Sequence, residues 1–210
     1  MKIAVIGTGN VGSILGTRLA HQGHEVIFGS RDPRAAKVVS VVQSAGPNAR
    51  ADTNAAAANA AEVIILTVPY FGAEETIKGL GPLKGKVLID TTNALLPDLS
   101  GLSLRAGESA GENIAGWAAG AHVVKAFNTV GTRVMEDPEY GDDRALLLIC
   151  GDSAGAKATT ADLADELGFN AVDAGPLTMA RHLESLAMLW IQLAFVQGMG
   201  TDFALKILNR

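Results

Sequence analysis

The sequence has only one cysteine, Cys150, among its 210 residues. A single cysteine cannot form an intrachain disulfide, and it does not provide the several thiolates that structural zinc sites commonly use. We therefore expect no bound metal. Cys150 ends an apolar run, so we expect its thiol to be buried and unreactive.

Positive charge and long apolar runs are also scarce. The chain has 17 Lys and Arg against 22 Asp and Glu, a formal net charge of −5, and no basic stretch. Partners such as nucleic acids and acidic membranes call for concentrated positive charge, so we expect neither. The apolar run over residues 186–196 is too short to cross a bilayer, and residues 1–6 are too short for a signal peptide. We expect a cytoplasmic protein.

Short apolar runs alternate with Ala-rich or amphipathic stretches, a pattern typical of a parallel sheet wrapped by helices. We expect strands at residues 3–6, 26–30, 49–52, 63–66, 87–90, 123–127, 146–150 and 170–173. We expect helices at residues 11–22, 32–44 and 55–61, with Asn54 capping the third. Residues 96–116 are expected to form a long loop, and the chain from residue 179 to its end is expected to be helical, broken at residues 198–200.

These elements predict an α/β fold of the Rossmann type, with a doubly wound, mainly parallel sheet. We expect two parts. Residues 1–177 form a dinucleotide-binding domain, and residues 178–210 form a small C-terminal helical segment.

A glycine-rich turn, Gly7-Thr8-Gly9-Asn10-Val11-Gly12, follows the first expected strand. GxGxxG alone is a weak signal in a chain with 24 glycines, but here it joins a strand to a helix within a βαβ unit. Gly7 permits the tight turn, Gly9 lets the backbone approach a pyrophosphate, and Gly12 allows close packing of the helix. The turn predicts a dinucleotide site whose pyrophosphate binds at the helix N-terminus.

The end of the second expected strand indicates which dinucleotide binds. Sites for NAD place a carboxylate there to bind the ribose 2′-hydroxyl. This chain has Ser30 and Arg31 instead, with Arg34 nearby, and an arginine binds a 2′-phosphate through charge-assisted hydrogen bonds. Asp32 could pair with either arginine or bind the ribose. The segment predicts NADP(H).

With these motifs in place, the chain resembles the NADPH-dependent reductases of the deazaflavin coenzyme F420. It is also similar to the cytoplasmic oxidoreductase domain of the STEAP metalloreductases. Besides the glycine turn and Gly29-Ser30-Arg31, the resemblance rests on several further motifs. They are Thr67-Val68-Pro69-Tyr70, Lys125-Ala126-Phe127-Asn128-Thr129, Asp173-Ala174-Gly175-Pro176-Leu177, Arg181 with Glu184-Ser185-Leu186, and Gly198-Met199-Gly200.

The resemblance implies hydride transfer between NADP(H) and a flavin-like acceptor, which is F420, FMN or FAD. The chain has Asn128 where the F420 reductases carry His, and in this it looks like the metalloreductases. The C-terminal segment is expected to close over the acceptor through Met199 and Gly200. The expected cofactor-binding residues are Gly7, Thr8, Gly9, Asn10, Val11, Gly12, Ser30, Arg31, Arg34, Thr67, Val68, Pro69, Tyr70, Asn93, Asn128 and Thr132.

We expect no catalytic acid or base, because hydride transfer between stacked rings depends chiefly on positioning. Lys125 is a weak candidate, and a role in anchoring the structure is at least as consistent with its place at a strand end. Arg181 and Glu184 are spaced for a local ion pair on a helix. The interpretation that we prefer is that they link the last helix to the sheet.

Two other functions remain open at this point. One is reduction of a small carbonyl or imine substrate, and the other is a regulatory NADP(H) sensor without turnover. Trp190 and Phe195 on a largely apolar helix indicate burial in the core or in a homodimer interface.

Overall fold

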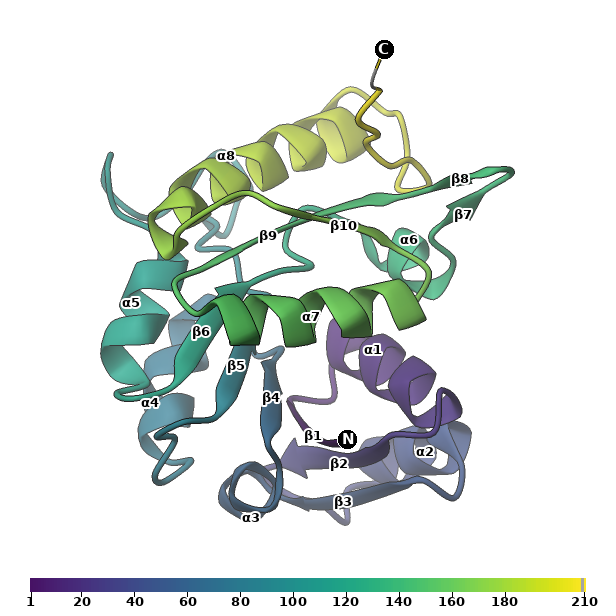
Figure 1. The fold of residues 1–210 in the computed structure, drawn as a ribbon, viewed down its shortest axis with the longest axis vertical. Helices are drawn as coiled ribbons and strands as arrows, with labels where there is room; N and C mark the ends of the chain where they lie inside the picture. The colour runs from purple at the N-terminus through teal and green to yellow at the C-terminus, as the bar shows by residue number, and fades with distance from the viewer. Residues whose placement is uncertain (209) are drawn as a thin grey trace.

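The computed structural model describes residues 1–208 and Arg210, and it consists of one large sheet covered by helices on both faces (Figure 1). The eight strands of this sheet are β1 (Lys2–Ile6), β2 (Glu25–Ser30), β3 (Ala49–Thr53), β4 (Val63–Leu66), β5 (Val87–Asp90), β6 (His122–Lys125), β9 (Leu146–Gly151) and β10 (Asn170–Asp173). Their spatial order is β10-β9-β6-β5-β4-β1-β2-β3. The first six strands have the order of a doubly wound Rossmann sheet, so the predicted fold is confirmed.

The last two strands run against the others, which the sequence pattern did not predict. Strands β1 to β6 pair in parallel, whereas β9 pairs antiparallel with β6 and β10 pairs in parallel with β9. Between β6 and β9 the chain forms a short helix, α6 (Thr132–Glu136), and a hairpin of β7 (Glu139–Tyr140) and β8 (Asp143–Arg144). Through this segment the chain returns beside β6 in the opposite direction, so that β6 and β9 pair as antiparallel neighbours.

The remaining helices form two layers. They are α1 (Asn10–His21), α2 (Ala36–Ala45), α3 (Asn54–Ala60), α4 (Ala73–Lys78), α5 (Ala110–Trp117), α7 (Ala154–Glu166) and α8 (Ala180–Ile191), with the short helical turns η1 (Tyr70–Gly72), η2 (Leu177–Met179) and η3 (Gln192–Val196). Helices α1 and α7 contribute to the core on one face, and α3, α4 and α5 contribute to the core on the other. None of the helices in residues 1–208 is long and apolar enough to cross a membrane.

The second helix begins four residues later than predicted, at Ala36 instead of Asp32. Pro33 disfavours a helical backbone at the residue before it. Asp32 instead accepts a hydrogen bond from the Arg34 N–H at 3.0 Å, which folds residues 32–35 into a turn. The basic segment after β2 is therefore a turn and not the start of a helix.

Two further predictions on the first half of the chain were wrong. Thr53, and not Asn54, caps α3, because the Thr53 side chain accepts a hydrogen bond from the Ala56 N–H. The expected loop over residues 96–116 contains most of α5. Ser109 caps its start, since the Ser109 Oγ accepts a hydrogen bond from the Glu112 N–H and donates one to the Glu112 carboxylate.

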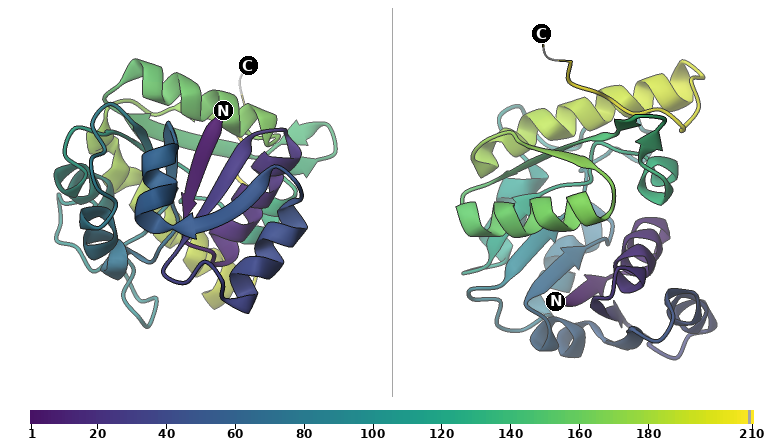
Figure 2. Two further views of the ribbon diagram at one scale, coloured as in Figure 1. Left: turned by 90° about the horizontal axis from the view of Figure 1, so that it is seen from below. Right: turned by 45° about the vertical axis from the view of Figure 1, so that its right-hand side comes forward.

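The predicted break at residues 198–200 is confirmed, but the helix expected after it was wrong, since residues 201–208 contain no helix. Gly198 and Gly200 have left-handed φ angles of 73° and 77°, which end the helical path. The tail that follows lies along β9, where the Leu205 carbonyl accepts a hydrogen bond from the Leu146 N–H at 3.0 Å. Helix α8 and this tail lie at one end of the molecule, and β2 and β3 lie at the other (Figures 1 and 2).

Candidate functional site

The glycine-rich turn between β1 and α1 has the geometry that its sequence predicted. Gly7 has a φ of 114°, which an L side chain rarely adopts. A Cβ on Gly12 would lie 2.1 Å from the Gly7 carbonyl oxygen, whereas a Cβ on Gly9 would have no atom within 4 Å. Gly12 is therefore required by packing, and Gly9 leaves open space in front of the backbone.

The first turn of α1 is suited to an anion. Gly9 is the N-cap and gives no side-chain hydrogen bond, and the first turn contains no acidic residue. The leading N–H groups of a helix have no partner within the helix, and the helix dipole places partial positive charge there. This end of α1 fits a pyrophosphate.

Thr67 follows β4 and holds the glycine turn in place. Its hydroxyl lies 3.0 Å from the Ile6 carbonyl oxygen and 3.1 Å from the Gly7 carbonyl oxygen, both of which can accept its proton. A Cβ on Gly7 would lie 2.8 Å from the same hydroxyl oxygen. Thr67, which we expected to contact the cofactor, thus has its hydroxyl directed to the turn backbone.

A cavity of about 460 Å³ opens beside the turn, between the ends of β1, β2 and β4 and helix α4. The residues that line it are Gly7, Thr8, Gly29, Ser30, Arg31, Asn54, Val68, Pro69, Gly72, Glu75, Thr76 and Gly79. Ligands of doubly wound sheets bind at the carboxyl ends of the strands where the strand order reverses, and here β1 and β4 flank that point. Six of the expected cofactor-binding residues are therefore brought together, along with Asn54, which was expected only as a helix cap.

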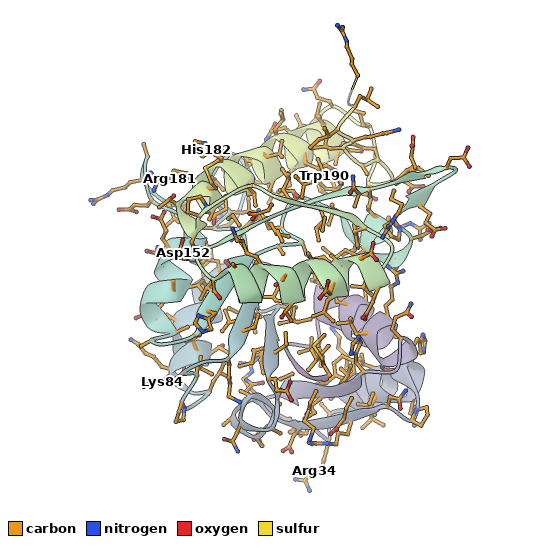
Figure 3. All side chains as sticks on the ribbon, viewed as in Figure 1. Arg34, Lys84, Asp152, Arg181, His182 and Trp190 are labelled. Atoms are coloured by element: carbon orange, nitrogen blue, oxygen red, sulfur yellow. The ribbon has the colours of Figure 1, made fainter. Side chains whose placement is uncertain are left out.

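The basic turn after β2 supplies the positive charge of this cavity. Arg31 is exposed and is the one cationic residue among those that line it. Asp32 makes no ion pair with either arginine in the described part of the chain, and its carboxylate accepts a hydrogen bond from the Arg34 N–H. Arg34 does not line the cavity, and Figure 3 shows its side chain directed outward at the margin of the molecule.

Tyr70 lies just beyond the cavity. Its hydroxyl oxygen accepts a hydrogen bond from Asn113 Nδ2 at 2.8 Å, and its ring packs against Trp117 with centroids 5.8 Å apart. These contacts join η1 to α5. The side chain is thereby fixed next to Pro69, at the rim of the cavity.

Asn93 and Asn128 meet at the ends of β5 and β6. Asn93 Nδ2 donates to the Asn128 carbonyl oxygen at 2.9 Å, and Asn128 Nδ2 donates to Asn93 Oδ1 at 3.1 Å. Asn128 is 6% exposed, and its Oδ1 is buried without a hydrogen-bond partner in the described structure. Each buried acceptor of this kind is costly unless a ligand or water supplies a donor.

Phe127 turns the chain so that Asn128 reaches this position. The strand predicted over residues 123–127 ends at Lys125, and Phe127 has a φ of 62°. A bulky residue rarely adopts such an angle, and strained residues of this kind cluster at functional sites. The Phe127 ring is 2% exposed and lies edge to face on Phe169 at 5.7 Å, a contact that supports the strained backbone. Nothing in the sequence pattern indicated this role.

Lys125 is fully buried in a cluster of charged groups. Its Nζ lies 2.8 Å from Asp90 Oδ2, 2.9 Å from Glu184 Oε1 and 2.5 Å from the Thr92 carbonyl oxygen. Burial alone would lower the pKa of Lys125, but the Asp90 and Glu184 carboxylates outweigh it and raise the pKa. These contacts favour the anchoring role over proton donation.

Glu184 connects α8 to the rest of the molecule. Besides Lys125, its carboxylate accepts hydrogen bonds from the Ala110 and Gly111 N–H groups at the start of α5. Arg181 pairs with Glu112 of α5 at 3.1 Å. The local pair between Arg181 and Glu184 is therefore not formed. The preferred interpretation, a link from the last helix to the sheet, is confirmed for Glu184 through Lys125 of β6, whereas Arg181 links α8 to α5.

The C-terminal motif lies against the loop that follows Asn128. A Cβ on Gly131 would lie 2.6 Å from the Trp190 ring and 3.3 Å from the Thr201 carbonyl oxygen. Thr132, an expected cofactor contact, begins α6 directly after Gly131. The turn of Met199 and Gly200, which ends at Thr201, is thus next to the loop over residues 128–132. Met199 is 57% exposed.

Cys150 has the unreactive environment that was predicted. It is fully buried, and burial raises its pKa to about 12. Across residues 1–208 and Arg210, no three His, Cys, Asp or Glu side chains are grouped as metal ligands would be.

Comparisons with known proteins agree with this geometry. Residues 2–94 match the family model described as NADP oxidoreductase, coenzyme F420-dependent. The chain is 37% identical over 207 residues to the F420-dependent NADP reductase of Methanothermobacter marburgensis, covering 92% of each chain. It is 29% identical to the metalloreductase STEAP3 of Rattus norvegicus over 89% of this chain, but that match covers only 36% of the larger protein.

Solved structures give the same result. A crystal structure from Arthrobacter sp. FB24, provisionally assigned as an F420-dependent NADP reductase, matches with a TM-score of 0.89 and 32% identity, with all of both chains covered. A reductive aminase from Aspergillus terreus matches with a TM-score of 0.69 over 94% of this chain and 62% of that chain, at 21% identity. The aminase shares the fold only. On the strength of the full-length similarity, this chain belongs to the family of F420-dependent NADP reductases.

Proposed function

We propose that this protein transfers a hydride between NADP(H) and coenzyme F420. The observation that carries the proposal is the cavity at the end of β2, where Arg31 is the lining cation, in a chain related over 92% of its length to an F420-dependent NADP reductase. The choice of F420 as the hydride acceptor rests on the name of that relative. The choice of NADP(H) over NAD(H) rests on the cavity, where Arg31 can bind the 2′-phosphate.

The described residues fit NADP(H). The open space at Gly9 and the uncapped N-terminus of α1 suit the pyrophosphate, and the cavity beside Ser30 and Arg31 suits the 2′-phosphorylated adenosine. Asn128 Oδ1, buried without a partner, would accept a hydrogen bond from the carboxamide of the nicotinamide. Asn93 holds the Asn128 amide in place for that contact.

When bound, the nicotinamide supplies the hydride donor or acceptor, and the protein contributes position and exclusion of water. Lys125 then has a structural role. Its contacts with Asp90 and Glu184 join β5, β6 and α8, which carry the loops around the proposed ring site.

We further propose that residues 178–210 form the segment that closes the acceptor site. The support is the contact of Gly131 with Trp190 and Thr201, which brings the turn containing Met199 and Gly200 to the loop over residues 128–132. The helical part of this segment ends at Val196, so Met199 and Gly200 belong to an irregular turn.

A homodimer formed through this end of the molecule is part of the proposal. Trp190 is 7% exposed and belongs to the core, but Leu189, Phe195 and Val196 are 55%, 59% and 63% exposed. Neighbouring exposed apolar residues of this kind commonly mark an interface. A monomeric mass by light scattering at micromolar concentration would contradict the dimer. The cytoplasmic location and the absence of a nucleic-acid partner stay predictions from composition.

The acceptor is tested by turnover. Purified protein with NADPH is mixed separately with F420, FMN and FAD, and nicotinamide absorbance is followed together with the absorbance of each acceptor. We expect stoichiometric loss of NADPH and F420 absorbance, with much slower oxidation by FMN or FAD. If NADPH were oxidised faster by FMN or FAD than by F420, that flavin would be the acceptor and the assignment of F420 would be wrong. Tight NADPH binding without oxidation by any acceptor would favour a regulatory sensor.

A further inference from the structure

We propose that Asn54 contacts the adenosine ribose of NADP(H) and contributes to the selection of the 2′-phosphorylated dinucleotide. This inference rests on the proposed function, since it assigns a further residue to the same cofactor site. Asn54 lines the cavity together with Ser30 and Arg31. Its neighbour Thr53 pairs directly with Ser30 across β2 and β3, which places Asn54 opposite the basic turn.

The Asn54 amide is not used by the fold. Thr53 takes the capping role on α3 by accepting from the Ala56 N–H at 3.2 Å. Asn54 Oδ1 is buried and has no hydrogen-bond partner in the described structure. An acceptor withdrawn from water without a donor costs free energy, and Asn54 lines the cavity, so rotation of its amide toward a bound ligand would gain the hydrogen bond that the fold does not supply.

The position of the amide restricts which part of the cofactor it can reach. A Cβ on Gly29 would lie 3.0 Å from Asn54 Oδ1 and 3.3 Å from the Asn54 Cα. Asn54 therefore lies against the backbone at the end of β2, one residue before Ser30. A ligand group bound against Ser30 and Arg31 at this strand end would lie next to Asn54.

The chemistry of an amide suits a phosphorylated ribose. Its oxygen accepts a hydrogen bond from the 3′-hydroxyl, and its NH₂ group donates to an oxygen of the 2′-phosphate. A carboxylate at this position would keep the first contact but would repel the phosphate. Substitution of Asn54 by Asp should therefore remove the contact with the 2′-phosphate and keep the contact with the 3′-hydroxyl.

The experiment compares Asn54→Asp and Asn54→Ala with the wild type in titrations with NADPH and NADH, followed by calorimetry or fluorescence. We expect Asn54→Asp to weaken NADPH binding by about 10-fold or more, and to change NADH binding by less than about threefold. Asn54→Ala should weaken NADPH binding by about 10-fold or more, because it removes two hydrogen bonds, of which one is to the charged phosphate. Asn59→Ala, at an exposed position on the same helix, is the control and should change neither.

The outcomes separate this inference from the function on which it rests. A wild-type protein that fails to bind NADPH overturns the proposed function. A wild-type protein that binds NADPH, with both Asn54 variants binding it within threefold of wild type, overturns only the role of Asn54. Thermal denaturation checks the fold. Asp at a first helical position with the Thr53 cap intact should be tolerated, and Asn54→Ser is the alternative if either variant is unstable.

Discussion

Lys125 Nζ on β6 lies 2.9 Å from Glu184 Oε1 on α8, and both side chains are almost completely buried, with exposures of 0% and 1%. The contact joins the sheet to the last helix across 59 residues of sequence. Asp90 completes the cluster from the neighbouring strand β5. Substitution of one of these three residues by a neutral one would leave the other two buried and charged.

Substitution of Lys125 by Met should destabilise the protein by about 3–5 kcal/mol, because Asp90 and Glu184 would remain buried without their counter-ion. Urea denaturation followed by circular dichroism measures the change. Lys84→Met, at an exposed position that Figure 3 shows at the periphery, is the matched control and should change stability by less than about 0.5 kcal/mol. A loss below about 1 kcal/mol for Lys125→Met would contradict the anchoring role.

The stabilisation by Lys125 should also depend on alkaline pH. The folded pKa of Lys125 is raised above its ordinary value of 10.5, so its contribution is complete below that pH and is lost as the pH rises through the folded pKa. The free energy of unfolding of the wild type should therefore fall above about pH 10.5 relative to Lys125→Met. A difference between the two proteins that stays constant from pH 9 to the alkaline limit of folding would show that the folded pKa of Lys125 is not raised, and a difference that shifts in favour of the wild type as the pH rises would show that the lysine is uncharged in the fold.

Arg31→Ala should weaken NADPH binding by about 10- to 150-fold, since a charge-assisted hydrogen bond to phosphate contributes about 1.5–3 kcal/mol. NADH binding should change little because NADH has no 2′-phosphate. Arg34→Ala is the comparison variant, because its side chain lies outside the cavity and is directed away from it. Titrations at one fixed salt concentration test both, and an equal or larger effect of Arg34→Ala would reverse the assignment.

Gly9→Ala and Gly12→Ala should separate binding from folding. A Cβ at Gly9 meets no protein atom within 4 Å, so the variant should fold with a loss of about 1 kcal/mol or less while binding NADPH much more weakly. A Cβ at Gly12 would lie 2.1 Å from a backbone oxygen and should lower the melting temperature substantially. Thermal denaturation with and without NADPH distinguishes the two. Normal NADPH affinity in Gly9→Ala would argue against a pyrophosphate at this turn.

Cys150 should resist a thiol reagent such as DTNB at pH 8 in the native protein. Its pKa of about 12 leaves almost no thiolate, and the side chain is fully buried. Unfolding in urea should expose one reactive thiol per chain. Rapid stoichiometric labelling without denaturant would show that the C-terminal half opens readily.

The sequence alone predicted the parts of the site that depend on local geometry. The glycine turn, the strand before it and the basic end of β2 follow each other within about 30 residues. Steric rules and helix electrostatics apply to such a segment wherever it lies. The strands β4, β5 and β10 were also predicted to the residue. β4 is a continuous apolar run because it is buried on both faces, whereas β10 is a partly exposed edge strand whose short apolar pair lies between Asn170 and Asp173.

The predicted starts of α2 and α3 differ from the observed ones because polar side chains near the helix start bond to backbone N–H groups. Asp32 and Pro33 delayed α2, and Thr53 took the cap that Asn54 was expected to form. The cap formed by Ser109 lies within residues 96–116, which contain several Gly and Ser residues and Pro97, and this composition favoured the prediction of a loop.

Only the tertiary structure decided which distant residues share a site. Glu184 is spaced for a pair with Arg181, yet each bonds to another element, since Lys125 and Glu112 lie closer in the folded chain. The amide pair of Asn93 and Asn128 depends on the neighbouring registers of β5 and β6 and on the strained backbone at Phe127. Such contacts are set by how the strands align and how the helices pack, and no periodicity along the chain encodes them. The sequence determined that a dinucleotide binds, and the packing of the sheet decided which side chains surround it.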